Sequence, residues 1–149
     1  GTHAMKVLLA TLATALVLGA PAPSPAADEF VVIVHPSVGG ASIRRPDLAA
    51  LFLKTATRWG DKSPAVPVDQ SGTSEVRKAF CDSVLKMPVA AALQYWQKQM
   101  FGGSPLRPPA VKGSDAEVLA FVEKTEGAVG YVSKATSLPA GVRALVVID

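Results

Sequence analysis

Residues 30–35, with the sequence FVVIVH, form a continuous run of mostly β-branched apolar side chains. Such a run is typical of a strand buried on both faces, because a strand with one solvated face alternates apolar and polar residues. Segments with helical spacing of apolar residues follow it and alternate with further short apolar runs. Alternating strands and helices favour a mostly parallel sheet with helices on both faces. The sequence therefore predicts an α/β fold, a three-layer αβα sandwich around a mostly parallel, mixed sheet.

The expected elements follow the chain in the order β-α-β-α-α-α-β-β. We expect strands at residues 30–35, 65–68, 129–132 and 142–148. We expect helices from Pro46, from the Ser71-Gly72-Thr73 turn to about Met87, from Pro88 through Met100, and from Ser114 to Glu126. The Gly/Pro-rich residues 101–112 are expected to form an exposed loop. Apolar stripes on the predicted helices place five large side chains in the core, namely Phe52, Phe80, Leu93, Trp96 and Phe121.

The beginning of the chain has the layout of a secretion signal. Residues 1–4 are typical of a cloning remnant. A lysine then precedes the apolar residues 7–20, and small residues lead to an expected cleavage site after Ala26. A membrane span needs about 20 apolar residues, so we expect a cleavable signal peptide at 5–26 and a single periplasmic domain at 27–149. The alternative is a buried N-terminal helix.

Charge and composition argue against several classes of protein. The 149 residues include 15 Lys and Arg against 12 Asp and Glu, without a basic block, which argues against nucleic-acid binding. Cys81 is the only cysteine, so neither an internal disulfide nor a cysteine-based zinc site can form. The sequence has neither the nucleophile motif G-x-S-x-G nor the P-loop pattern. We therefore expect a protein that is not an enzyme and that uses no cofactor or metal.

The best chemical signal is the turn between the second predicted strand and the next helix. Gly72 lets backbone N–H groups approach a ligand, and Ser71, Thr73 and Ser74 supply hydroxyls that can donate to oxygen. The helix dipole adds about half a positive charge at that end. This combination is typical of a site for phosphate or sulfate, and Gln70 at its start is a further candidate ligand. The alternative is ordinary N-capping, for which Ser and Thr are common residues.

Other polar residues near strand ends are candidate additions to this site. Ser37 follows the first strand, and we expect it at the same sheet edge as the Ser71 turn, where it would face the ligand. The alternative is a plain loop that ends the strand. Arg77 lies one turn into the helix, near enough to help an anion, although a solvated helix face is the simpler interpretation.

Four segments resemble one lobe of the periplasmic phosphate-binding protein of phosphate ABC transporters, a type II periplasmic binding protein. They are LAALFLKTATRW at 48–59, PVDQSGTSEVRKAF at 67–80, VKGSDAEVLAFV at 111–122 and GAVGYV at 127–132, and they occur in the family's order. The resemblance implies an exported lobe that binds an oxyanion. It also implies that Ser71, Gly72 and Thr73 contact phosphate, since the family uses the Ser, Gly and Thr of this turn.

Two features depart from the family pattern. The family usually has an Arg four residues before the Ser of the turn, where it pairs with the anion, and this chain has Pro67 there. A complete binding protein of the family also has two lobes with the ligand buried between them, whereas one lobe is recognisable here. An anion on a single lobe stays half solvated, so that each contact is weaker.

Two functions from different classes remain open. The first is a periplasmic protein that binds inorganic phosphate or a similar oxyanion. The second is an interaction module that keeps the scaffold without the ligand and acts as an accessory to an envelope protein or as a homodimer. Neither involves nucleic acid or stable membrane insertion of the mature chain. The intact Ser71–Ser74 turn favours the first function, and Pro67 and the missing lobe favour the second.

Overall fold

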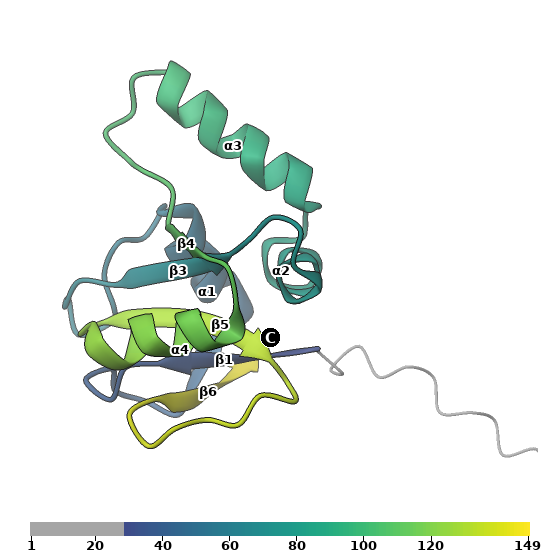
Figure 1. The fold of residues 1–149 in the computed structure, drawn as a ribbon. Helices are drawn as coiled ribbons and strands as arrows, with labels where there is room; N and C mark the ends of the chain where they lie inside the picture. The colour runs from purple at the N-terminus through teal and green to yellow at the C-terminus, as the bar shows by residue number, and fades with distance from the viewer. Residues whose placement is uncertain (1–28) are drawn as a thin grey trace, which may run out of the picture.

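A computed structural model describes residues 29–149, which form one mixed sheet flanked by helices (Figure 1). The expected cloning remnant at 1–4 and signal peptide at 5–26 lie outside the described residues. The strand order in the sheet is β2-β6-β1-β5-β3-β4. The strands are β1 (Phe30–Val34), β2 (Ser42–Arg44), β3 (Val66–Gln70), β4 (Ala110–Lys112), β5 (Ala128–Ser133) and β6 (Arg143–Ile148).

One strand of this sheet, β1, runs antiparallel to its neighbours. β1 pairs antiparallel with both β5 and β6, and it lies between them. The remaining pairs, β2 with β6, β3 with β4 and β3 with β5, are parallel. Five of the six described strands therefore run the same way, which confirms the expected mostly parallel, mixed sheet.

Helices cover both faces of the sheet, α4 in front and α1 behind in the view of Figure 1. The helical elements are α1 (Arg45–Leu53), α2 (Glu75–Phe80), the π-helical turn η1 (Cys81–Leu85), α3 (Val89–Phe101) and α4 (Asp115–Lys124). Val32 and Ile33 are neighbours on β1 and belong to two different apolar clusters, because successive side chains of a strand point to opposite faces. The αβα layering follows from these two cores.

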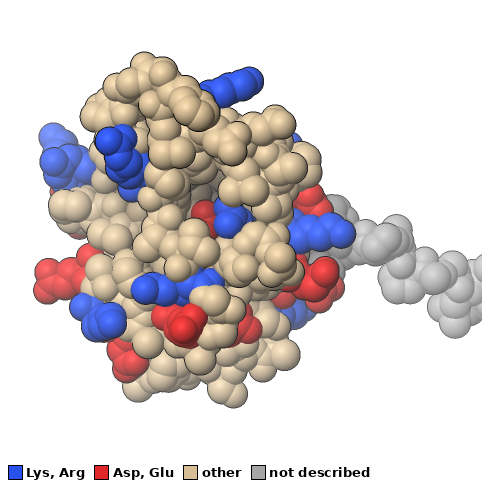
Figure 2. Space-filling view, turned by 45° about the horizontal axis from the view of Figure 1, so that its top comes forward, with Lys and Arg blue, Asp and Glu red and all other residues tan. Residues whose placement is uncertain are grey.

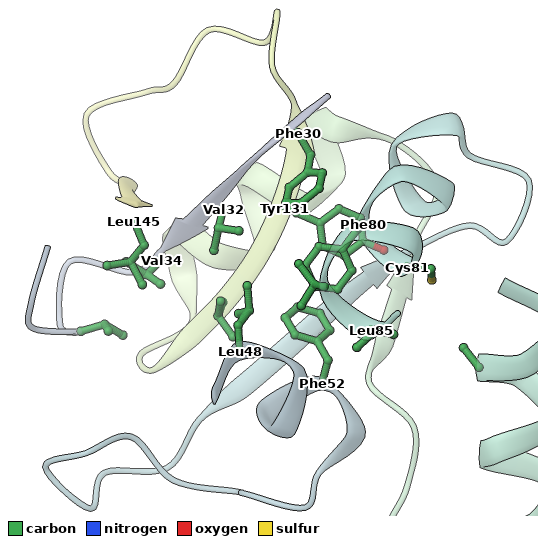
Figure 3. Close-up of a cluster of buried hydrophobic side chains, with 14 residues drawn as sticks. Phe30, Val32, Val34, Leu48, Phe52, Phe80, Cys81, Leu85, Tyr131 and Leu145 are labelled. Carbon is green, nitrogen blue, oxygen red and sulfur yellow. The ribbon is translucent and has the colours of Figure 1, made fainter. Parts of the chain in front are cut away.

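The larger core lies on the side of α1 and α2 and is built around aromatic rings (Figure 3). The Phe80 ring stacks on Tyr131 with centroids 4.0 Å apart and planes 6° apart, and Phe52 lies 4.6 Å from Phe80. The smaller core packs Val118 and Val122 of α4 against the other face. Burial of these aliphatic and aromatic groups supplies the main stabilising free energy of the lobe.

Several predicted boundaries were wrong. The helix expected from the Ser71 turn to Met87 changes character at Cys81, continues as η1 and ends at Leu85, before Lys86 with a φ of 58°. The expected loop at 101–112 ends in β4, a short strand at the edge beside β3. Strand β2 at the opposite edge was not predicted either. Three-residue edge strands leave no periodic signal, so pairing with a neighbour is what forms them.

The core prediction holds for Phe52, Phe80 and Trp96, which are buried, and fails for Leu93, which is 48% exposed. Helix α3 stands away from the sheet in Figure 1, and its buried side runs through Ala92 and Trp96 rather than along the centre of its apolar stripe. Phe121 is half-buried. Helical spacing identifies a stripe, but only tertiary packing decides how far that stripe is covered.

Candidate functional site at the Ser71–Ser74 turn

The Ser71–Ser74 turn joins the end of β3 to the start of α2, as the sequence predicted. Ser74 is the N-cap of α2, and its hydroxyl accepts a hydrogen bond from the backbone N–H of Arg77 at 3.2 Å. The N–H of Ser74 donates to the carbonyl oxygen of Ser71 at 2.9 Å, which closes the turn. Ser74 therefore caps α2, and Ser71, Gly72 and Thr73 are not needed as caps.

The tip of the turn carries two hydroxyls and one backbone amide that a ligand could contact. The hydroxyls of Ser71 and Thr73 share a hydrogen bond at 3.1 Å, which leaves the proton of one of them for a ligand, and Gly72 between them is exposed. Within residues 29–149 the N–H of Gly72 has no hydrogen-bond partner, whereas the N–H of Ser71 donates to the carbonyl of Lys112 at 2.9 Å. Two hydroxyls and one free amide thus converge at the surface, an arrangement that suits an oxyanion.

Gln70 immediately precedes the turn and is 3% exposed. Its side-chain amide donates to Oδ1 of Asp115 at 2.6 Å and to the carbonyl of Tyr131 at 3.1 Å. Its side-chain oxygen accepts from the Ser74 hydroxyl at 3.2 Å. The Gln70 side chain therefore ties the turn to the first residue of α4 and leaves the outer surface of the turn to Ser71, Gly72 and Thr73.

A second buried network lies under the turn on the other face of β3. Asp69 is 5% exposed, accepts a hydrogen bond from the Tyr131 hydroxyl, and has its Oδ2 3.8 Å from Nη2 of Arg77. Removal from water raises the pKa of the Asp69 carboxyl, an effect that Arg77 and the Tyr131 hydrogen bond oppose. The same burial, with Asp69 beside it, raises the pKa of the Tyr131 phenol. Arg77 is 5% exposed, so the expectation of a solvated position for it was wrong.

Ser37 lies at the end of the sheet where β3 and β5 begin, opposite the end where β3 leads into the turn, which corrects the prediction that the two lie together. The hydroxyl of Ser37 accepts a hydrogen bond from the N–H of Gly127, the residue just before β5, at 3.0 Å. The N–H of His35 donates to the carbonyl of Ala128 at the start of β5. Because β1 runs antiparallel to β5, the end of β1 meets the beginnings of β5 and β3 rather than their carboxyl ends.

A cavity of about 680 Å³ opens beside the turn, between the beginnings of α2 and α4. Four carboxylate residues line it, Glu29, Glu75, Asp82 and Asp115, against one lysine, Lys78. The face of the molecule shown in Figure 2 carries interspersed basic and acidic side chains without a basic block. The surroundings of the turn therefore do not attract anions by net charge, so that affinity has to come from the donors of the turn itself.

Three further findings concern residues 29–149. They contain no group of three or more His, Cys, Asp or Glu residues that could hold a metal ion. Cys81 is fully buried, and burial raises the pKa of its thiol, which disfavours the reactive thiolate. In the same described part of the chain, no helix is long and apolar enough to cross a membrane.

Sequence reasoning missed the supporting residues of the site. Tyr131 and Asp115 lie 60 and 44 residues after Ser71 in the sequence, and nothing in their local patterns links them to the turn. One signal for the buried network was present in the sequence. Arg77 lies three residues before Phe80, so the two share a face of α2, and Phe80 marks that face as the buried one. Only the three-dimensional structure brings these side chains together.

The sequence matches no protein-family model and no curated protein. Solved structures do match. A phosphate ABC transporter substrate-binding protein from Clostridium perfringens, solved with bound phosphate, is 18% identical, with a TM-score of 0.58 over 80% of this chain and 45% of that protein. An ABC-type phosphate transport receptor from Vibrio cholerae is also 18% identical, with a TM-score of 0.56 over 80% of this chain and 46% of the receptor.

PstS from Borrelia burgdorferi gives a TM-score of 0.62 at 17% identity, over 80% of this chain and 47% of PstS. The chain has the fold of one lobe of these proteins. It thus spans less than half the length of the solved structures that it matches. The expected αβα lobe is confirmed, and at such low identity the likeness concerns the fold alone.

Proposed function

We propose that the chain is exported to the periplasm and that its lobe binds inorganic phosphate or a similar oxyanion at the Ser71–Ser74 turn. The observation that carries this proposal is the exposed group of donors at Ser71, Gly72 and Thr73, where β3 ends. Ligands of open α/β sheets bind at such strand ends. The likeness to a substrate-binding protein solved with bound phosphate supports the choice of anion.

The deciding experiment is a calorimetric titration of the purified 27–149 chain with phosphate and, separately, with sulfate. Gly72→Asp places a carboxylate at the centre of the donors and should abolish binding through bulk and like charge. The fold should tolerate this change, because a Cβ at Gly72 meets only Cγ1 of Val89, at an ordinary 3.8 Å. Equal heats for the wild type and Gly72→Asp would show that the anion binds elsewhere.

Gly60→Asp is the matched control for charge and for substitution of an exposed glycine. A Cβ at Gly60 meets nothing within 4 Å, and Gly60 lies in the turn before β3, away from the carboxyl end of the strand. This variant should bind phosphate as the wild type does. Lost binding in both variants would indicate a general effect of added negative charge rather than a site at Gly72.

The second candidate function is an interaction module without a ligand, acting as a homodimer or as an accessory to an envelope protein. Exposed apolar side chains favour it. Val146 is 62% exposed and Ile148 44% on β6, and Phe101 at the end of α3 is 90% exposed. Large exposed apolar groups that gather on a surface mark contacts with other proteins. Two results together would support this function over the first. Titration with phosphate and sulfate would give no heat of binding, and light scattering would show a dimer that Val146→Glu dissociates.

A further inference from the structure

Two buried side chains hold the peptide groups at the base of the Ser71–Ser74 turn. The backbone N–H of Gln70 donates a hydrogen bond to the Tyr131 hydroxyl at 3.2 Å. On its other side, Nη1 of Arg77 donates to the carbonyl oxygen of Gln70 at 2.9 Å. Both peptide groups of Gln70 are therefore fixed before the chain enters Ser71, and with them the direction in which the turn leaves β3.

Burying Arg77 costs desolvation free energy, which a purely structural role does not explain. Its guanidinium is removed from water and its ion partner Asp69 is 3.8 Å away. Its Nε is buried and has no hydrogen-bond partner within the described part of the chain. A well-packed apolar pair stabilises a core as well as a buried ion pair or better, and an unpaired buried donor costs free energy.

The place of Arg77 in the fold suggests why the free-energy cost of burying its guanidinium is tolerated. Side chains at positions 67 and 69 share one face of β3, because strand residues alternate. Pro67 brings no charge to that face, and the cation beside Asp69 is Arg77 of α2. A hydrogen bond from a charged donor is about twice as strong as one between neutral groups, so Arg77 sets the Gln70 carbonyl firmly inward.

We propose that Arg77 is a positioning residue of the anion site. It holds the Gln70 carbonyl toward the interior, so that the next residues present the Gly72 amide and the Ser71 and Thr73 hydroxyls to the outside. Arg77 acts through the turn and does not itself touch the anion. This inference rests on the proposed function where it concerns binding, while the ordering of the turn is testable without a ligand.

The test separates positioning from stability by means of three variants. Arg77→Met removes the donor and strands the buried Asp69 carboxylate. Asp69→Asn combined with Arg77→Met removes the donor without leaving an unpaired charge, so most of the lost stability should return. Val84→Ala is the control, because Val84 is 2% exposed on the same helical run and makes no polar contact with the turn.

Phosphate titrations of the folded variants give the first readout. We expect the double variant to bind phosphate about tenfold more weakly than the wild type, or weaker still, despite its regained stability, because the lost hydrogen bond has a charged donor. Val84→Ala should keep the wild-type affinity. The proposal is overturned if affinity returns together with stability in the double variant, or if Val84→Ala loses as much affinity.

Amide hydrogen exchange without phosphate gives the second readout, and it stands even if the wild type binds no anion. The Ser74 amide, whose bond to Ser71 closes the turn, should exchange about tenfold faster in the double variant than in the wild type or Val84→Ala. Unchanged exchange would overturn the positioning role whatever the titrations show. Absent phosphate binding with faster exchange would contradict the proposed function alone.

Discussion

The hydroxyl of Tyr131 in β5 donates a hydrogen bond to Oδ1 of Asp69 in β3, between two strands that pair in parallel. The ring of the same tyrosine stacks on Phe80 in the middle of the larger core. One side chain thus belongs both to the apolar packing of the lobe and to the polar network under the Ser71–Ser74 turn. Changes at Tyr131 should therefore affect stability and the turn together.

Tyr131→Phe keeps the stacked ring and removes the hydroxyl that serves Asp69 and the N–H of Gln70. We expect a loss of about 1–3 kcal/mol in free energy of unfolding, because buried polar groups lose their partner. Tyr95→Phe is the control, since its half-buried hydroxyl donates to a single carbonyl, that of Leu53, at 2.7 Å. Tyr95→Phe should lose about 0.5–1.5 kcal/mol in free energy of unfolding. Equal losses in urea denaturation would show that the Asp69 contact adds nothing.

The buried carboxyl of Asp69 should give the lobe a pH dependence of definite sign. Burial raises its pKa in the folded state, whereas the unfolded chain titrates near about 3.9. The folded protein therefore keeps this proton to higher pH, so the contribution of Asp69 to stability is greatest at low pH and falls as pH rises from about 4 toward the folded pKa. Urea denaturation between pH 4 and pH 7 should show a decline that is smaller in Asp69→Asn.

Asp61 provides the control of opposite sign. Hydrogen bonds from the Ser63 hydroxyl and backbone N–H lower the pKa of this exposed carboxyl. Its contribution is present above the unfolded pKa and is lost as pH falls. Asp61→Asn should therefore leave the decline above pH 4 unchanged. A decline equal in the wild type and Asp69→Asn would assign the pH dependence to other groups.

Helix α3 offers a paired test of burial. Trp96 is 6% exposed, and Trp96→Ala should reduce the free energy of unfolding by about 3–5 kcal/mol. Leu93 lies three residues away on the same helix and is 48% exposed, so Leu93→Ala should change the free energy of unfolding by less than about 0.5 kcal/mol. A loss below about 1 kcal/mol for Trp96→Ala in chemical denaturation would place the indole on the surface instead.

Glu75 should weaken anion binding in the wild type. This exposed glutamate is the first residue of α2, directly after the turn. Glu75→Gln removes a like charge and should tighten phosphate binding about two- to fivefold at low salt, with a smaller gain at high salt. Glu126 is exposed two residues after the end of α4, and Glu126→Gln is the control that should have no such effect. A gain of the same size in both would indicate net charge rather than the place of Glu75.

The residues of the turn were recognisable from the sequence because their signal is local. A glycine between hydroxyl residues, between a strand and a helix, is a pattern of neighbours, and the structure has Ser74 as the N-cap that such a pattern predicts. Ser114 likewise caps α4 by accepting from the N–H of Glu117 at 3.2 Å. Gly127 has a φ of 77°, a backbone conformation that favours glycine.

The sequence by itself determined the α/β class, the two-sided burial of β1 and the position of the Ser71–Ser74 turn, because burial and local conformation leave a pattern along the chain. Only the tertiary structure decided the direction of β1, which pairs Phe30 with Ser133 across about a hundred residues and carries Ser37 away from the turn. It also decided that Arg77 points inward to Asp69. Strand direction and the partners of a buried charge depend on contacts between distant segments, and a local pattern does not record those contacts.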